Sequence, residues 1–344
     1  MKAPDPESTL SVLARLVSLT DPNTQTVLIG AAVLGLGAGV VGALAVLRRR
    51  ALLGDCVAHA SLPGICLAFM IVGERSLPVF MAGACVLGLA AVACIAVVRA
   101  YTRVKEDAAI GIALASFFGL GIVLLTRLQK VGSGNRAGLD RFLFGQAATM
   151  VRQDVMLIGG IVLVALAVVV VLVKEFGLLC FDREFAAASG RRVLALDFLL
   201  MALVCVCTVA GLPAVGVVLM AALLIIPAVA ARLWVTRFGP MLVLSGTIGA
   251  ASGAMGTLLS AGLPAPSAST GAAGAGWPTG PLITLVAALI FGVSLVGAPR
   301  RGLLAAGLRT WRLRRALAGR GLHGPLDSRF APAGTGASGP EARP

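Results

Sequence analysis

A nearly unbroken apolar run extends from Val193 to Leu233, and it constrains the fold more than any other feature of the chain. Its length of about 41 residues, at 1.5 Å per residue, is roughly twice what a helix needs to cross a hydrocarbon core about 30 Å thick. Apolar residues make up 58% of the whole chain and charged residues only 13%, which is not the composition of a soluble domain. The sequence therefore predicts an all-α, polytopic helical membrane protein.

Other apolar segments are each long enough for one further span. The 193–233 run divides best near Gly211, Leu212 and Pro213, because a proline interrupts helical hydrogen bonding. Glycines at 30, 35, 37, 39 and 42 give the first span small faces for close helix packing. The result is nine predicted spans, or eight if one short segment is re-entrant: about 27–47, 52–72, 78–98, 108–127, 154–173, the two halves of 193–233, 240–262 and 280–298.

These spans divide the chain into three parts. We expect an N-terminal lead (1–26), a transmembrane domain (27–298) and a basic, partly disordered cytoplasmic tail (299–344). The formal net charge of +14 lies largely in basic clusters between spans, and nine spans place most of them on one face: 48–50, 99–105, 174–192, 232–237 and the tail. The positive-inside rule makes that face cytoplasmic and puts the N-terminus outside, with the 127–141 loop as the exception. Because almost no aromatic residues are interleaved with these clusters, nucleic-acid binding is not indicated.

An acid and an imidazole interrupt the second predicted span. Asp55 and His59 are four residues apart, so a helix places them on one face, where they can offer an oxygen and a nitrogen to one point. Pro63 has no N–H to donate to the His59 carbonyl, which adds a further polar group, and Gly64 allows another backbone to approach closely. Ionisable groups at bilayer depth usually face a bundle interior or a water-filled path. The pattern predicts a cation route.

Two other interpretations of this pair are open. The first is that Asp55, about one turn beyond Arg50, is simply a solvated group near a helix end. The second is an intramembrane aspartyl protease, which needs a second acid within the membrane. Its candidate partners, Asp107, Asp154 and Asp197, all lie at span edges, and the protease interpretation is therefore disfavoured.

Residues 174–192 are the only long interior segment that combines mixed charge with helical character. We expect a short helix outside the bilayer that ends at Gly190. It is either an ordinary loop helix or a coupling helix that docks into a separate motor subunit. The chain has no GxxxxGK[ST] phosphate-binding loop, so any ATPase must be another polypeptide.

Pro213 and Pro227 are predicted helix breaks within the long apolar run, as Pro63 is in the second span. A structural kink is one explanation for them. The alternative is a discontinuous helix that exposes backbone carbonyls to an ion.

Several of these stretches together resemble the permease subunits of bacterial ATP-binding-cassette importers for zinc, manganese and iron. The likeness extends from about residue 25 to 298, with order and spacing preserved. It is carried by LRRRALLGDCVAHASLPGICLAF (47–69), RVKEDAAIGIALASFFGLGIVLL (103–125), RFLFG (141–145), FDREFAAASG (181–190), AGLPAVGVVLMAALLIIPAVAARL (210–233) and WPTGPLITL (277–285). Cys56 departs from the pattern, because a small residue such as alanine is usual there.

The resemblance implies site residues and partners. The GDxxxH motif of the family maps its metal-path residues onto Asp55 and His59. The ATPase-contacting loop of the family maps onto Asp182, Glu184, Phe185, Ala186 and Gly190. The implied partners are a cytoplasmic ATP-binding subunit, an extracytoplasmic metal-binding protein and a second permease subunit, in a homodimer or a related pair.

The resulting interpretation is a multi-pass subunit of the bacterial inner membrane that is not itself an enzyme. It would import a divalent cation (Mn, Zn or Fe) as cargo, with no covalently bound cofactor, and its Arg-rich tail would contact anionic lipid. The sequence does not select among the three metals. Two alternatives are an ATP-driven importer of a metal chelate or cofactor and a stand-alone, proton-coupled secondary transporter.

Overall fold

The computed structural model describes residues 22–73, 76–131, 150–263 and 277–299, together with Gly145, Gly302 and Trp311. The regular elements in these ranges are all helices. They are α2 (Pro22–Leu47), α3 (Leu52–Ala60), α4 (Leu62–Val72), α5 (Leu77–Tyr101), α6 (Glu106–Val131), α8 (Arg152–Val171), α9 (Val173–Phe181), α10 (Arg183–Ala188), α11 (Val193–Val215), α12 (Val217–Trp234), α13 (Phe238–Gly262) and α14 (Thr279–Gly297).

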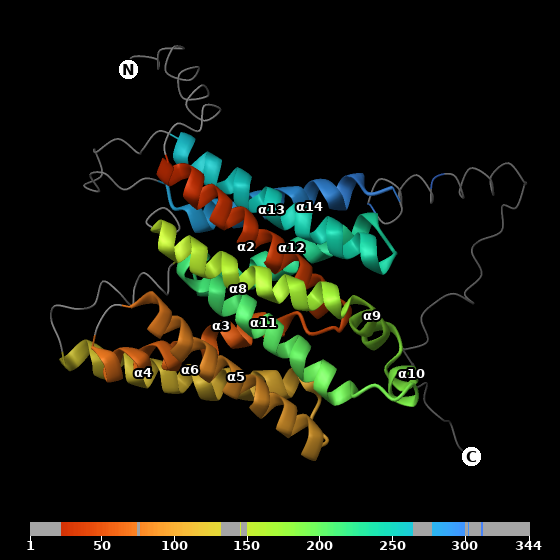
Figure 1. Cartoon of the computed structure of the whole chain (residues 1–344), viewed down its shortest axis with the longest axis horizontal. Helices are drawn as coiled ribbons and strands as arrows, with labels where there is room; N and C mark the ends of the chain where they lie inside the picture. The colour runs from red at the N-terminus through yellow and green to blue at the C-terminus, as the bar shows by residue number, and fades with distance from the viewer. Residues whose placement is uncertain are drawn as a thin grey trace, which may run out of the picture.

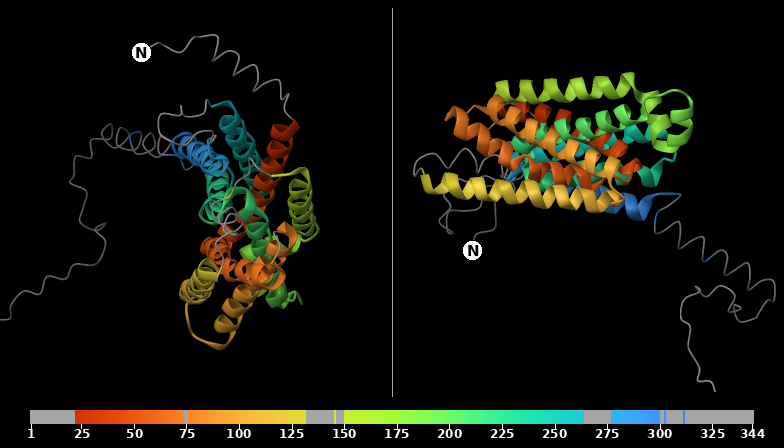
Figure 2. Two further views of the ribbon diagram at one scale, coloured as in Figure 1. Left: turned by 90° about the vertical axis from the view of Figure 1, so that its left-hand side faces the viewer. Right: turned by 90° about the horizontal axis from the view of Figure 1, so that it is seen from below.

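The helices form an elongated bundle in which the long elements run along a common direction (Figure 1). Nine segments of the described chain are long and apolar enough to cross a membrane, with α3 and α4 together making one of them, Leu52–Val72. This confirms the predicted all-α, polytopic fold, and the nine candidate spans among the described residues agree with the larger of the two predicted counts. The short helices α9 and α10 lie at one end of the bundle, as Figure 1 and the right-hand view of Figure 2 show.

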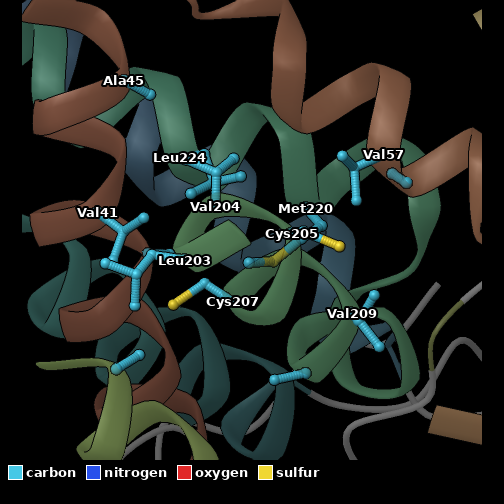
Figure 3. Close-up of a cluster of buried hydrophobic side chains, with 14 of the residues drawn as sticks. Val41, Ala45, Val57, Leu203, Val204, Cys205, Cys207, Val209, Met220 and Leu224 are labelled. Atoms are coloured by element: carbon cyan, nitrogen blue, oxygen red, sulfur yellow. The ribbon is translucent and has the colours of Figure 1, made fainter. Parts of the chain in front are cut away.

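Helix α11 occupies the middle of the bundle and packs against α2, α3, α5, α8 and α12. Figure 3 shows its residues Val204, Cys205 and Cys207 among side chains of α2, α3 and α12. Cys56, Cys66, Cys205 and Cys207 are buried as small apolar residues, whereas Cys94 is exposed. The exposed apolar side chains of α8, such as Val170 and Val171, suit a lipid environment.

Glycines bring α2 and α13 into backbone contact. A methyl group added at Gly39 would lie 2.3 Å from the Ser245 carbonyl oxygen, and one at Gly35 would lie 2.2 Å from that of Gly249. The Ser245 hydroxyl donates a hydrogen bond of 2.6 Å to the Gly39 carbonyl across the same interface. The small faces predicted for the first span are therefore used for close packing.

Pro213 and Pro227 each interrupt the backbone hydrogen bonding of a helix without ending it. Pro213 lies inside the last turns of α11, and the helix ends only at Gly216, whose φ of 93° is a conformation that glycine adopts readily. Pro227 lies within α12, which continues to Trp234. Each proline removes one N–H without ending its helix, because packing on both sides holds the flanking turns in the buried core.

Residues 1–21 of the predicted N-terminal lead lie outside the described part of the chain, and its last residues, from Pro22 on, belong to α2. The same holds for most of the predicted tail and most of the 127–141 loop.

Candidate metal site and coupling segment

Asp55 and His59 share one face of α3, with Asp55 in its first turn and His59 in its last. His59 Nε2 lies 3.6 Å from Asp55 Oδ1, which is beyond a good hydrogen bond. Two ligand atoms about 2.1 Å from one ion at a tetrahedral angle are about 3.4 Å apart, so this spacing suits a shared cation. The Asp55 side chain is 39% exposed and the His59 side chain is 23% exposed, so both are accessible from outside the protomer.

The contact between His59 and Phe118 shows where the imidazole lies along the length of α6. The two rings meet edge to face, with centroids 4.8 Å apart. Phe118 stands 12 residues after Glu106, the first residue of α6, and therefore about 18 Å along that helix. The imidazole thus lies beside the middle of a membrane-length helix, which disfavours a solvated helix end.

The helix break near Pro63 occurs at Ser61, between α3 and α4, and Pro63 occupies the first turn of α4. Proline is favoured there, because the first N–H groups of a helix lack helical partners. The Ser61 N–H points to both the Val57 and the His59 carbonyls, so the wholly free His59 carbonyl expected from the sequence is not present. A methyl group on Gly64 would lie 2.2 Å from the Gly83 carbonyl oxygen, which confirms the predicted close backbone approach.

Within the described residues, no group of three or more histidine, cysteine, aspartate or glutamate side chains could hold a metal ion. The Cys56 thiol is buried and lies 3.5 Å from the Ile110 carbonyl oxygen, to which it can donate. Asp154 accepts a hydrogen bond from the Val151 N–H at the start of α8, and Asp197 is ion-paired with arginines. Two of the three candidate protease partners therefore have other roles, and the third, Asp107, is an exposed residue in the first turn of α6. The site in this protomer offers two ligand groups.

The predicted coupling segment consists of two helices, α9 and α10, rather than one. Asp182 separates them, because its side chain turns back to accept a hydrogen bond of 2.9 Å from the Phe185 N–H and so caps α10. The segment ends at Gly190, as predicted, with a φ of 75° and with the Gly190 and Arg191 N–H groups bonded to the Ala187 and Ala186 carbonyls.

The side chains of this segment divide between a packed and an exposed face. Ala186 is buried, whereas Glu184 and Phe185 are exposed, the latter at 58%. The rings of Phe181 and Phe238 pack edge to face with centroids 6.1 Å apart, so α9 rests on the start of α13. The segment is therefore anchored to the bundle and presents a charged and aromatic surface away from it.

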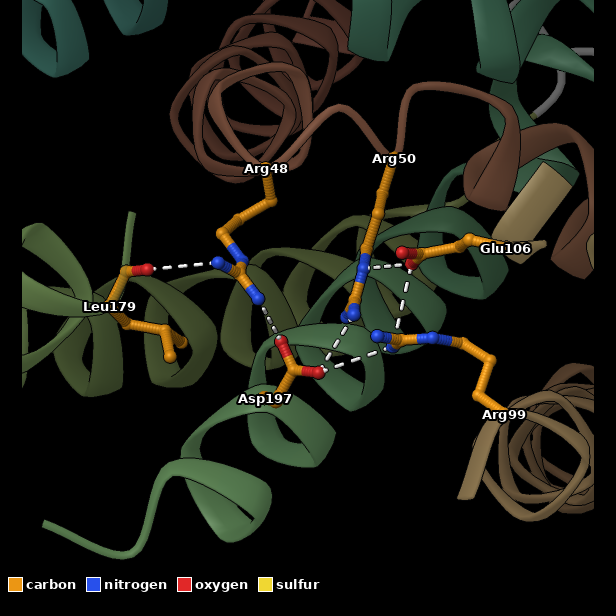
Figure 4. A network of polar contacts seen from close by, with 6 residues as sticks. All are labelled: Arg48, Arg50, Arg99, Glu106, Leu179 and Asp197. Atoms are coloured by element: carbon orange, nitrogen blue, oxygen red, sulfur yellow. Dashed lines mark hydrogen bonds and ion pairs between the residues drawn. The ribbon is translucent and has the colours of Figure 1, made fainter. Parts of the chain in front are cut away.

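A buried ion network lies behind α9, and sequence reasoning missed it (Figure 4). Asp197, near the start of α11, is its centre: Oδ1 lies 2.9 Å from Arg48 Nη2, and Oδ2 lies 2.7 Å from Arg50 Nη2 and 3.4 Å from Arg99 Nη1. Glu106 also pairs with Arg50 and Arg99. Three guanidinium groups thus share two carboxylates.

The turn after α2 directs the network's arginines inward. The Arg49 and Arg50 N–H groups bond to the Val46 and Ala45 carbonyls, with Arg49 at a φ of 60°, which is the hydrogen-bond pattern of a glycine-type helix end. Arg49 is exposed, while Arg50 is only 1% exposed. The sequence interpretation of residues 48–50 as a basic cluster on the cytoplasmic face is therefore incomplete. The sequence signal that could have predicted the network was Asp197, an acid at the edge of the 193–233 apolar run and on the same predicted face as the arginines.

Comparison with known proteins decides the family. Residues 20–298 match the model of the ABC 3 transport family. The chain belongs to the ABC 3 transport family.

Relatives in this family agree with that assignment. The chain is 47% identical over 299 residues to the manganese transport system membrane protein MntC of Bacillus subtilis, covering 87% of this chain but only 66%, just under two thirds, of the relative. It is 41% identical over 306 residues to the zinc transport system membrane protein TroC of Treponema pallidum, covering 89% and 97%. The solved structure of PsaBC from Streptococcus pneumoniae in complex with Fab is similar at a TM-score of 0.70 and 30% identity, covering 88% and 99%.

Membership of the ABC 3 transport family confirms the resemblance found in the sequence. The chain is therefore a multi-pass protein of the bacterial inner membrane, and ATP hydrolysis belongs to a separate subunit. An importer subunit of this kind works with ATP-binding and substrate-binding partners.

Proposed function

We propose that the chain is the membrane-spanning subunit of an ATP-driven importer of a divalent transition-metal ion: Mn, Zn or Fe. The observation that carries this proposal is the Asp55 and His59 pair, whose ligand atoms lie 3.6 Å apart on one helix face within a membrane span. One carboxylate and one imidazole, without a thiolate cage, suit these ions and permit release. The names of the relatives, which specify manganese or zinc, support the same cargo class.

The pair by itself would leave a divalent ion under-coordinated, because Mn, Zn and Fe take four to six ligands. We propose that a second permease subunit faces the exposed side of Asp55 and His59. If that subunit is another copy of this chain, a two-fold axis would bring together two carboxylates and two imidazoles. Closure of such a seam would hold the ion, and separation of its halves would release it.

The segment α9–α10 is proposed to dock into the cytoplasmic ATP-binding subunit through Asp182, Glu184, Phe185, Ala186 and Gly190. Exposed Phe185 is the aromatic anchor of this surface, and Asp182 and Gly190 hold α10 in its capped form. An extracytoplasmic metal-binding protein would approach the opposite end of the bundle. The Arg-rich tail is proposed to contact anionic lipid.

Uptake of Mn²⁺, Zn²⁺ and Fe²⁺ into proteoliposomes tests the cargo and the pair together. Asp55→Asn and His59→Gln should each abolish uptake while leaving assembly with the ATP-binding subunit unchanged. Asp107→Asn is the matched control, because Asp107 is an exposed acid in the first turn of α6. Normal uptake by Asp55→Asn and His59→Gln would remove this pair from the mechanism.

The alternatives predict different results in the same vesicles. A stand-alone secondary transporter would carry metal without the ATP-binding subunit and would respond to a proton gradient. An importer of a metal chelate or cofactor would need the complexed form of the metal. Uptake of the free cation that requires ATP and the second subunit would exclude both.

A further inference from the structure

The coupling segment is tied to the bundle by a hydrogen bond from an arginine to its backbone. Arg48 Nη1 donates to the Leu179 carbonyl oxygen at 2.9 Å. Leu179 lies in the last turn of α9, where carbonyl groups have no partner within the helix and where the helix dipole favours a cation. Arg48 therefore completes the C-terminal end of α9 with a charge-assisted bond.

Through Asp197 and Arg50, the same guanidinium is connected to the helix that carries the proposed metal ligands. Its second terminal nitrogen lies 2.9 Å from Asp197 Oδ1, and the other oxygen of Asp197 lies 2.7 Å from Arg50 Nη2. Arg50 accepts a backbone hydrogen bond from the Leu53 N–H and so belongs to the start of α3, five residues before Asp55. A continuous polar path thus runs from α9 to α3 (Figure 4).

A second branch reaches the opposite wall of the proposed metal site. Arg50 and Arg99 both pair with Glu106, the first residue of α6. The same helix carries Phe118, whose ring contacts His59. The network therefore contacts both helices that frame the Asp55 and His59 pair.

The composition of the network makes it suited to transmitting movement. Arg50 and Asp197 are almost fully buried, and separating a buried ion pair leaves an uncompensated charge, so the pair tends to move as a unit. By contrast, Arg48 bridges two elements through separate nitrogens and is partly accessible. Arg48 is therefore the residue through which α9 can form or break its contact with the rest of the ion network.

We propose that Arg48 and Asp197 are positioning residues that transmit movement of α9 to the helices of the metal site. The proposal rests on the proposed function above, because α9–α10 must be the segment that the ATP-binding subunit moves. Displacement of α9 pulls Arg48, Arg48 shifts the Asp197 and Arg50 pair, and α3 moves with Arg50. Neither Arg48 nor Asp197 contacts the transported ion in this mechanism.

The neighbouring residue Arg49 offers a matched control. It carries the same charge at the same end of α2, but it is exposed and lies outside the network. Arg48→Gln removes the link. Arg48→Lys keeps the positive charge but lacks the guanidinium fork that reaches two acceptors at once.

The test measures metal uptake and ATP hydrolysis in proteoliposomes containing the complex of the full chain with its ATP-binding subunit, using Mn²⁺ and Zn²⁺ as probes. Arg48→Gln and Arg48→Lys should lower the number of ions carried per ATP hydrolysed by about tenfold, since each loses a charge-assisted link. Their ATP hydrolysis should stay within about twofold of wild type, as should both activities of Arg49→Gln. A purely structural role would instead lower assembly, hydrolysis and uptake together.

The outcomes separate this inference from the proposed function. If the wild-type complex carries no metal with ATP, the proposed function fails and this inference fails with it. If the wild type transports and Arg48→Lys keeps the wild-type ratio of ions to ATP, this inference alone is wrong. Should Arg48→Gln fail to assemble, Arg48→Lys decides, and parallel loss of hydrolysis and uptake in Arg48→Lys would also overturn the inference.

Discussion

Arg50 Nη2 lies 2.7 Å from Asp197 Oδ2, although the two residues are 147 positions apart in the chain. Both side chains are almost completely buried where α11 begins and α2 turns into α3. The contact joins the first predicted span to the middle of the bundle. It also places two charges that sequence patterns assign to the membrane surface inside the protein.

Asp197→Asn is expected to destabilise the protein strongly. The substitution leaves three arginines with Glu106 as their only remaining carboxylate in the network, and breaking a buried ion pair costs about 3–5 kcal/mol. Thermal unfolding of the purified chain in detergent measures the loss. Asp107→Asn, at an exposed acid, should change stability by less than about 0.5 kcal/mol. Equal stability of the two variants would contradict the burial of this pair.

Gly39→Ala should disturb the contact between α2 and α13. The added methyl group would lie 2.3 Å from the Ser245 carbonyl oxygen, so the two backbones must separate, at a cost of about 3 kcal/mol. Gly292→Ala in α14 is the matched control, because nothing lies within 4 Å of its added methyl group and alanine favours a helix by up to about 1 kcal/mol. The same thermal assay should rank Gly39→Ala well below wild type and Gly292→Ala at or above it.

Asp182→Ala should weaken docking by removing the N-terminal cap of α10. It removes the side chain that accepts from the Phe185 N–H, which destabilises the capped form of α10 by about 1 kcal/mol. Co-purification of the ATP-binding subunit at low concentration measures the effect. Asp182→Asn keeps an acceptor at the cap and should retain the partner, and if it loses the partner as fully as Asp182→Ala does, the charge rather than the cap is what matters.

Phe118→Leu should lower metal uptake several-fold while leaving assembly intact. The ring meets the His59 imidazole edge to face, and its removal lets the imidazole leave the orientation that matches Asp55. Phe117→Leu changes the adjacent residue on α6 in the same way and is the control. Metal uptake at limiting cation concentration compares them, and equal effects of the two substitutions would argue against a specific role for Phe118.

Cys180 should react slowly with a maleimide at neutral pH. This thiol lies in α9, outside the membrane-length helices, and burial raises its pKa to about 11. Because the thiolate is the reactive form, the labelling rate of a variant with Cys180 as its sole cysteine should rise with pH up to about 11. Rapid, pH-independent labelling of the folded chain would contradict this burial, and labelling of the unfolded chain provides the reference rate.

Much of the site was predictable because it depends on local geometry. The spacing of Asp55 and His59 determines that they share a helix face wherever that helix lies. Gly190 likewise ends α10 through its own backbone conformation. Pro213 and Pro227 do not end their helices, because the surrounding core, which a local pattern does not describe, holds both helices together.

The sequence alone determined the membrane class, the number of spans, the facing acid and imidazole, and the family of the chain, since these follow from apolar length, helical period and motif order. Only the tertiary structure decided that Arg48 and Arg50 turn inward while Arg49 stays outside, and that one acid from α11 holds them. The physical reason is that the partner of a buried charge comes from wherever the fold brings an opposite charge, and a separation of 147 positions leaves no trace in local spacing.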